Sequence, residues 1–342
     1  MDIDSYVKTK RLEIGTYVSK KKIIYLDTNY WQKLKKQEED IYKDILAKSI
    51  RLVASNKCIF PFSEAIFWEI FKQSDIASLK RTSNLVDELS QGISLITSKE
   101  LLSLEFKHFI RSRTQKNVHD LNELVWTKLF FVVGNGLPMP TDEALFVSFY
   151  EFISKLSLSD VISMIEEGGN FEPLIHKDNV NRMNEEKEKY RNENSTFDAL
   201  FISELIGCVD IHKGILGDAM VQMYYKDTGR MPEQNYDYEK NAEQLKILIC
   251  NGFKLGKIIK ELPSLHILPE LFASMRWNRD RKYKDGNDTM DTLHASFALP
   301  YCDFFFTEKE LKTMIIQRKL DSRYNCVVES NPKEVLRILN SF

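Results

Sequence analysis

The sequence predicts an α/β fold in which a parallel sheet, flanked by helices, is interrupted by a mostly α-helical insertion. Near both ends of the chain, short apolar runs alternate with helix-like segments, which is typical of strands joined by crossover helices. Between about residues 98 and 280 the pattern changes to long helical periodicities with few β-branched runs. The chain has 342 residues, which is long enough to bury a substantial core.

Three apolar stretches near the N-terminus are candidates for buried strands. Residues 23–26 are followed at once by Asp27 and then by a helical pattern. The run KCIFPF (57–62) precedes Ser63, a suitable N-cap for the apolar-rich helix EAIFWEIFKQ. After a more polar helix, residues 92–97 (GISLIT) form the third apolar stretch.

The same alternation returns near the C-terminus. A helix-like segment, residues 288–299, leads through Pro300 into CDFFFTEKEL, which is an apolar strand, an acidic residue and a helix start. Residues 323–329 (RYNCVVE) supply one more strand, and an Asn-Pro pair precedes the closing helix KEVLRILNSF. We therefore predict one domain from residues 1–97 plus 280–342.

Residues 98–279 are predicted to form the helical insertion. Within it, the segment NRMNEEKEKYRNEN (181–194) is highly charged and has little apolar content, so it is either a solvated helix or a flexible connector. No internal repeat is visible. Five scattered cysteines without a CxxC pair are typical of buried thiols in a reducing compartment.

Charge and hydropathy leave the class of partner open. The formal net charge is −2, so any surface for nucleic acid must be a local patch. Residues 1–22 are polar and mixed in charge, with neither the apolar core of a signal peptide nor the length of a membrane span. We expect a cytoplasmic protein that does not bind membranes.

Acidic residues gather where the predicted strands end. Asp27 follows the first strand, Glu308 follows the late FFFT strand, and Glu69 lies in the helix after the second strand. Asp291 lies in the helix before the late strand, with Asp288 three residues earlier on the same face. In an open parallel sheet, ligands bind outside the carboxyl ends of the strands. Taken singly, each acid has an alternative as a helix cap or a solvated side chain.

Converging carboxylates would need a counter-charge. They repel one another, and the oxygen ligands that they offer suit Mg²⁺ or Mn²⁺. Such an ion supplies activation of an attacking water and stabilises the charge that develops on a phosphodiester. Other enzyme signatures are absent from the sequence: the GxxxxGK[ST] phosphate loop, the GxSxG elbow and the HExxH zinc helix.

Four short motifs, IYLDTN, SEAIFWEIFK, DTLHASFAL and FFFTEKEL, occur in the order and contexts of the acidic motifs of PIN-domain nucleases. The chain thus resembles a PIN-like protein, with the four acids matched in order by Asp27, Glu69, Asp291 and Glu308. Glu308 stands where the family usually has Asp. Asn29 matches a polar residue after the first acid, Thr307 matches the Thr or Ser before the last, and we expect both to contact the substrate. The resemblance implies a Rossmann-like sheet, a divalent metal ion and cleavage of RNA, although some relatives cut DNA flaps.

The segment MRWNRDRKYK (275–284) combines basic and aromatic side chains just before the helix that carries Asp291. It is either a solvated loop or a surface for phosphate contacts and base stacking, through Arg276, Trp277, Arg279, Arg281 and Lys282. Tyr30 and Trp31, just after the first acid, either stack on a base or pack their helix against the sheet.

The leading hypothesis is a Mg²⁺- or Mn²⁺-dependent endoribonuclease. An enzyme of this kind has to be restrained in a cell, so a toxin-like or phage-defence role with a protein inhibitor or activator is an extrapolation from it. The resemblance also implies self-association. One alternative is a non-catalytic PIN-like module that binds nucleic acid or protein, and another is a structure-specific DNA nuclease. Acidic residues at all four matched positions favour the enzyme.

Overall fold

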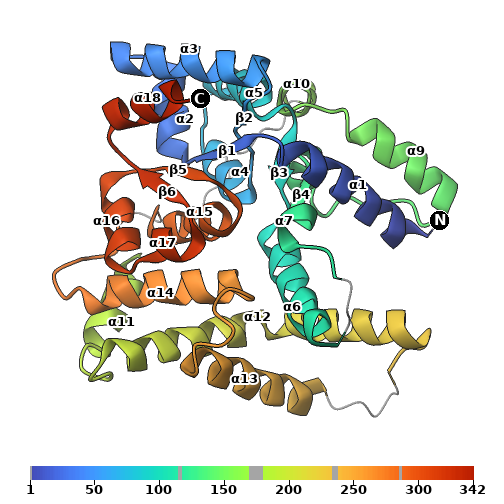
Figure 1. Ribbon diagram of the computed structural model, residues 1–342, viewed down its shortest axis with the longest axis vertical. Coiled ribbons are helices and arrows are strands. Elements are labelled where there is room, and N and C mark those ends of the chain that lie inside the picture. The colour runs from blue at the N-terminus through green and yellow to red at the C-terminus, as the bar shows by residue number, and fades with distance from the viewer. Residues whose placement is uncertain (1, 115–117, 169–179, 233–237, 285–286) are drawn as a thin grey trace. The chain divides into compact units, whose positions relative to one another are not determined.

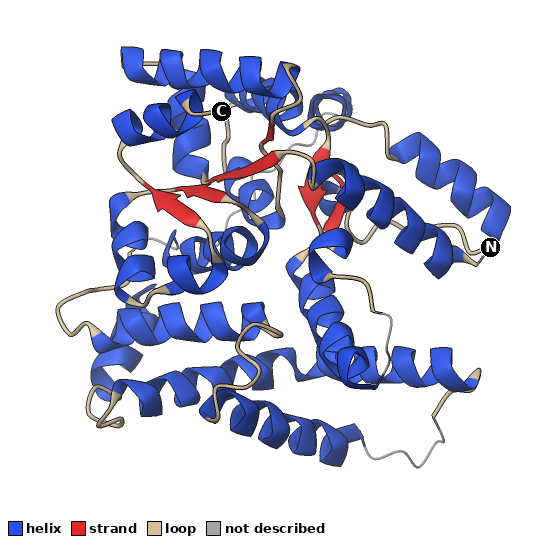
Figure 2. Ribbon diagram, viewed as in Figure 1, coloured by secondary structure: helices blue, strands red, loops and turns tan. Residues whose placement is uncertain are grey.

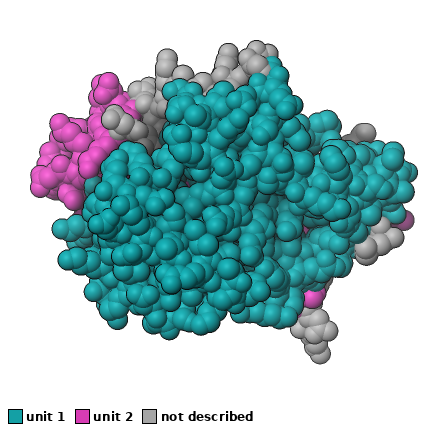
Figure 3. All heavy atoms as spheres, turned by 90° about the horizontal axis from the view of Figure 1, so that it is seen from above, with its two compact units in different colours: residues 1–97, 122–176, 297–342 teal, residues 98–121, 177–296 magenta. Residues whose placement is uncertain are grey.

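The computed structural model describes residues 2–114, 118–168, 180–232, 238–284 and 287–342. The chain forms two compact units, coloured separately in Figure 3. Unit 1 comprises Met1–Thr97, Asn122–His176 and Phe297–Phe342, and unit 2 comprises Ser98–Leu121 and Lys177–Ser296.

Unit 1 contains a four-stranded parallel sheet with the strand order β2-β1-β5-β6. Its strands are β1 (Lys22–Leu26), β2 (Cys58–Ile59), β5 (Phe304–Phe306) and β6 (Val327–Glu329). In the register of the sheet, Leu26 lies beside Phe306, which lies beside Glu329. Strands β1, β5 and β6 therefore end level with one another, and the predicted parallel sheet is confirmed.

A two-stranded antiparallel sheet continues unit 1 beyond β2. It consists of β3 (Ile93–Leu95) and β4 (Trp126–Lys128). Phe62, just past β2, forms a parallel bridge with β3: its N–H donates to the Ile93 carbonyl (3.0 Å), and the Leu95 N–H donates to its carbonyl (3.0 Å). The apolar run 57–62 thus joins β1 at its start and β3 at its end.

Helices flank the sheet of unit 1 (Figures 1 and 2). Those contributed by the two chain ends are α1 (Ile3–Val18), α2 (Thr28–Lys36), α3 (Asp40–Ala54), α4 (Glu64–Ile70), α5 (Ile76–Ser90), α16 (Lys309–Gln317), α17 (Leu320–Tyr324) and α18 (Pro332–Asn340). Helix α3 packs against α2, α5 and α18, whereas α16 and α17 pack against β6 and each other.

The middle of the chain also contributes to unit 1. Residues 122–176 contain β4, α8 (Phe130–Val133), α9 (Glu143–Ile153) and α10 (Leu158–Glu167). Helix α9 packs against α1, and α10 packs against α5, whose Asp87 carboxylate accepts hydrogen bonds from the Leu158 N–H (2.8 Å) and the Ser159 N–H (2.9 Å). The predicted boundaries assigned this segment to the helical insertion, but strand pairing and helix packing hold it in unit 1.

Unit 2 is helical in its described part. Its helices are α6 (Ser98–Thr114), α11 (Val180–Lys189), α12 (Phe197–Thr228), α13 (Tyr238–Lys254) and α14 (Pro263–Trp277). Phe106, Leu205, Ile249 and Leu265 are among the buried side chains of its core. Helix α7 (Leu121–Leu124) and helix α15 (Asn287–Tyr301) each begin in unit 2 and end in unit 1, so residues 280–296, predicted to belong with the sheet, are grouped with unit 2.

The helix length and hydropathy needed to cross a bilayer are not found together in any helix within the described ranges. The charged segment 181–194 includes α11, which has no buried residue, as expected for the solvated-helix alternative.

Candidate functional site

The candidate site lies where β1 and β5 end side by side. The chain runs from β1 to its neighbour β2 on one side, and from β5 to its neighbour β6 on the other side. The connections therefore leave the adjacent strands β1 and β5 in opposite directions. Such a switch point leaves a crevice at the carboxyl ends of the strands, where open α/β sheets bind ligands. Asp27 and Thr307 are the first residues after the two strands.

Asp27 connects the two helices that leave this switch point. It is buried (3% exposed), and it is the N-cap of α2, where its Oδ1 accepts a hydrogen bond from the Tyr30 N–H (2.9 Å). Its Oδ2 accepts from the Glu308 N–H (3.1 Å), at the start of α16. One backbone donor on each oxygen thus orients the carboxylate.

Thr307 places an unpartnered hydroxyl beside Asp27. Its backbone N–H donates to the Glu329 carbonyl (2.9 Å), which extends the pairing of β5 with β6. The side chain is fully buried, and its Oγ1 has no hydrogen-bond partner within the described ranges. Buried hydroxyls are normally satisfied, so this oxygen points to a ligand or water at the switch point.

Glu308 follows directly and is half-buried. It is the N-cap residue of α16, yet its side chain makes no capping hydrogen bond with that helix. The Glu308 backbone N–H is bound by Asp27, whereas the Glu308 carboxylate does not cap α16.

Glu69 lies on α4, which begins at the N-cap Ser63. The Tyr25 hydroxyl, in the middle of β1, lies 2.6 Å from the Ser63 Oγ. Burial raises the pKa of Tyr25 well above its ordinary value; the Ser63 hydrogen bond opposes this rise, and the negative charges of Glu69 and Asp27 add to it.

Sequence reasoning overlooked Glu329, the acid that ends β6. Its Oε1 accepts hydrogen bonds from the Lys312 Nζ (2.6 Å), the Ser330 N–H (2.7 Å) and the Asn331 N–H (2.9 Å). Burial raises the pKa of Glu329, but these hydrogen bonds lower it by more, so the carboxylate stays ionised. The signal was available, because Glu329 closes an apolar run in the same way as Asp27.

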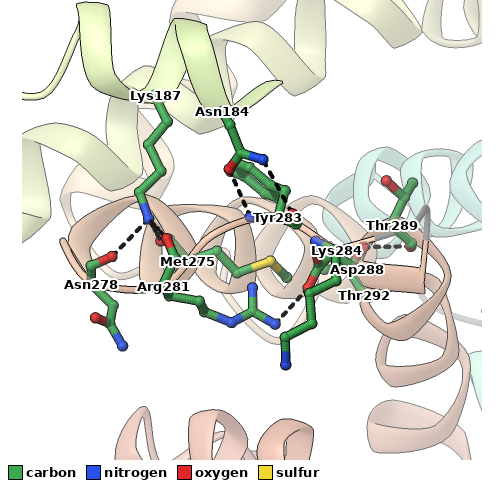
Figure 4. Close-up of polar contacts among 10 residues, drawn as sticks. All are labelled: Asn184, Lys187, Met275, Asn278, Arg281, Tyr283, Lys284, Asp288, Thr289 and Thr292. Atoms are coloured by element: carbon green, nitrogen blue, oxygen red, sulfur yellow. Dashed lines mark hydrogen bonds and ion pairs between the residues drawn. The ribbon is translucent and has the colours of Figure 1, made fainter. Parts of the chain in front are cut away.

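Helix α15 carries Asp288 and Asp291, both grouped with unit 2. Asp288 is buried and already engaged: it pairs with the Arg281 Nη2 (2.5 Å) and accepts from the Lys284 N–H (2.6 Å), as Figure 4 shows. We therefore leave it out of the proposed metal ligands. Asp291 is half-buried, and His294, on the next turn, is buried, in keeping with a structural role for that histidine.

The three residues after Thr28 differ sharply in exposure. Asn29 is exposed in the first turn of α2. Tyr30 (1% exposed) and Trp31 (0% exposed) are core residues, and the Tyr30 ring packs against Phe306 of β5 with centroids 6.1 Å apart. A buried ring offers no face to a base, so both rings pack the helix against the sheet, and the prediction that they bind substrate is wrong.

The side chains of the basic segment 275–284 also differ in exposure and pairing. Arg276 is paired with Glu204, and Arg281 is paired with Asp288, so these two guanidinium groups stabilise unit 2. The exposed residues of the predicted set are Trp277, Arg279 and Lys282. Arg276, Trp277 and Arg279 also line a pocket within unit 2.

The donors at the switch point are carboxylate and hydroxyl oxygens, which Mg²⁺ and Mn²⁺ accept as ligands. Across the described ranges, no three or more His, Cys, Asp or Glu side chains are grouped so that they could hold a metal ion. Comparisons of the chain with known protein families, with curated proteins and with solved structures find no match.

Proposed function

We propose that the chain is a metal-dependent nuclease that hydrolyses phosphodiester bonds, with RNA as its substrate. The observation that carries this proposal is the arrangement at the switch point. There the Asp27 carboxylate accepts the backbone N–H of Glu308, and the buried hydroxyl of Thr307, the residue before Glu308, lacks a partner among the described residues. The choice of RNA rests on the resemblance to PIN-like nucleases.

Asp27 and Glu308 would hold one Mg²⁺ or Mn²⁺, with Glu69 as the further carboxylate that unit 1 offers. Magnesium commonly uses one or two carboxylates and keeps several waters, so a preformed group of three protein ligands is not required. When bound, the cation supplies a water of lowered pKa and stabilises charge on the phosphate. The Thr307 hydroxyl would donate to one of the oxygens held at the site.

Two helix N-termini add to the attraction for phosphate at this edge. Helices α2 and α16 both begin at the switch point, and their first backbone N–H groups carry partial positive charge. This field offsets part of the repulsion between a polyanion and the carboxylates.

The test compares Asp27→Asn with Asp303→Asn. Asp303 precedes β5 at the amino ends of the strands, where its Oδ2 accepts a hydrogen bond from the Ile23 N–H (2.9 Å). Asp27 accepts two backbone N–H groups and Asp303 accepts one, so each substitution should cost about 1–3 kcal/mol, measured by thermal unfolding. Only Asp27→Asn removes a proposed ligand.

Cleavage of labelled total RNA and single-stranded DNA is measured in Mn²⁺, in Mg²⁺ and in EDTA. We expect metal-dependent cutting of RNA by wild type and by Asp303→Asn, and a loss of about 100-fold or more in Asp27→Asn, since even outer-shell changes at metal sites cost 10–100-fold. Cutting of DNA alone would favour the structure-specific DNA nuclease. Absence of both cutting and Mn²⁺ binding would favour the non-catalytic module.

A further inference from the structure

Unit 2 contains a pocket that the proposed cleavage site does not use. Its volume is 490 Å³, within the range of small-molecule pockets of about 300–1,000 Å³. It lies between the end of α11, the connection from α11 to α12, and the end of α14. The lining residues are Lys187, Tyr190, Arg191, Asn192, Asn194, Ser195, Leu200, Arg276, Trp277 and Arg279.

The charges on the lining are all positive. Arg276 is neutralised by Glu204, and the exposed Arg191 pairs with Glu188 (2.9 Å) in a solvated contact of little strength. Arg279 is exposed, and no ion pair or hydrogen bond of its side chain is found within the described ranges. A guanidinium in this position is suited to bind a phosphate through two parallel hydrogen bonds.

Two large rings on the lining are open to solvent. Trp277 is 46% exposed and Tyr190 is 42% exposed. The Trp277 ring meets Phe197 edge-on, with centroids 6.0 Å apart and planes at 79°, so this contact supports the ring without stacking on it. Exposed rings beside arginines provide the platform on which proteins stack nucleic-acid bases.

Asn194 adds an unsatisfied polar group. Its Nδ2 is buried and has no hydrogen-bond partner in the part of the chain that the structure describes. Most buried polar side chains are hydrogen-bonded, so an amide left in this state on a pocket wall points to a ligand or water that completes it. A base carbonyl or a phosphate oxygen would accept this hydrogen bond.

Hydrogen bonds hold the walls of the pocket in place. The Lys187 ammonium donates to the carbonyl oxygens of Met275 (2.9 Å), Asn278 (2.7 Å) and Arg281, which ties α11 to the end of α14 (Figure 4). The Asn184 side chain adds two hydrogen bonds to the backbone of Tyr283 in the same view. The pocket therefore exists before a ligand arrives, which lowers the cost of binding.

We infer that this pocket binds one nucleotide, with its base against Trp277 and Tyr190, its phosphate on Arg279, and Asn194 as a further donor. The nucleotide is either a free nucleoside phosphate or one residue of a single strand. Every group involved belongs to unit 2 and none is a proposed metal ligand, so the inference goes beyond the cleavage reaction and does not depend on it.

The experiment measures binding in EDTA, where the cleavage chemistry is silent. Anisotropy of fluorescein-labelled oligo(U) and oligo(A) reports strand binding, and calorimetry with AMP and ATP reports free nucleotides. Trp277→Ala should weaken binding roughly 5- to 150-fold, the range for loss of a stacking ring. Arg279→Ala should weaken it about tenfold or more, with a shallower salt dependence, whereas Arg279→Lys should retain part of the affinity.

The matched control is Arg230→Ala, which removes an exposed arginine of unit 2 that does not line the pocket. It should bind like wild type. Binding of AMP or ATP that is lost in Trp277→Ala would identify a free nucleotide as the ligand, and binding of oligonucleotides alone would identify a strand. Absence of binding to every probe, or equal affinities for Arg279→Ala and Arg230→Ala, would overturn the inference even if the protein cleaves RNA.

Discussion

Replacing Thr307 by valine should stabilise the metal-free protein and weaken its response to Mn²⁺. The Thr307 side chain is fully buried, and its hydroxyl has no partner among the described residues. A buried polar group in this state costs about 1–3 kcal/mol of lost hydration. Valine has nearly the same shape without the hydroxyl, so the free energy of unfolding in EDTA should rise by about that amount. For a domain of about 150–250 residues, this corresponds to a rise in Tm of roughly 2–12 °C.

The response to Mn²⁺ should change in the opposite direction. An ion that binds only the folded state stabilises it in proportion to the logarithm of its concentration over Kd. If the Thr307 hydroxyl supports the bound ion, its loss should weaken Mn²⁺ binding about 10- to 100-fold, as outer-shell changes do at other metal sites. Urea unfolding in EDTA and in excess Mn²⁺ measures both effects on one pair of proteins.

Thr82→Val is the matched control. Thr82 is also fully buried in unit 1, but its hydroxyl donates to the Ser78 carbonyl (3.0 Å), so this substitution should cost about 1 kcal/mol. If Thr307→Val is destabilised in EDTA as much as Thr82→Val, the Thr307 hydroxyl has a bound partner such as water. If Mn²⁺ stabilises wild type and Thr307→Val equally, the hydroxyl takes no part in ion binding.

Two further predictions concern stability. Glu329→Gln should lose about 1–3 kcal/mol at neutral pH, because the carboxylate accepts three hydrogen bonds. Because the pKa of Glu329 is lowered, this stabilisation is present above the ordinary value near 4.5 and is lost as pH falls through the folded-state value. Urea unfolding should therefore show that the difference in stability between wild type and Glu329→Gln becomes smaller in acid. A difference that grows in acid would contradict the assignment. Gly15→Ala should lose about 1–3 kcal/mol, since the new Cβ would lie 2.3 Å from the Glu123 backbone oxygen, whereas Gly207→Ala, with nothing within 4 Å, should gain about 0.5–1 kcal/mol. Thermal unfolding of these two variants in parallel checks the opposite signs.

Several strands could be located from sequence because a parallel sheet covered on both faces needs apolar residues at consecutive positions. The run 23–26 lies inside β1, and the phenylalanines of FFFT form β5. The coarse prediction of a parallel sheet flanked by helices is confirmed on these elements. The resemblance to PIN-like nucleases stays a prediction.

The assignment of residues 122–176 could not be made in this way. Strand β4 has only three residues, and it pairs with β3 through backbone groups that every sequence offers. Helix α1 was likewise not predicted: its apolar and charged residues are mixed along the segment, and it packs against β4 and α9. Both features depend on contacts between distant parts of the chain, which local periodicity does not report.

The sequence by itself determined that acidic residues follow the ends of β1 and β5, because strand ends and helix starts are local properties. Only the tertiary structure decided what each side chain does there. Asp27 meets the Glu308 N–H across 281 positions of sequence, Asp288 is taken by Arg281, and the rings of Tyr30 and Trp31 are buried. The physical reason is that exposure and hydrogen-bond partners are set by whichever segments fold against a residue, and these lie far from it along the chain.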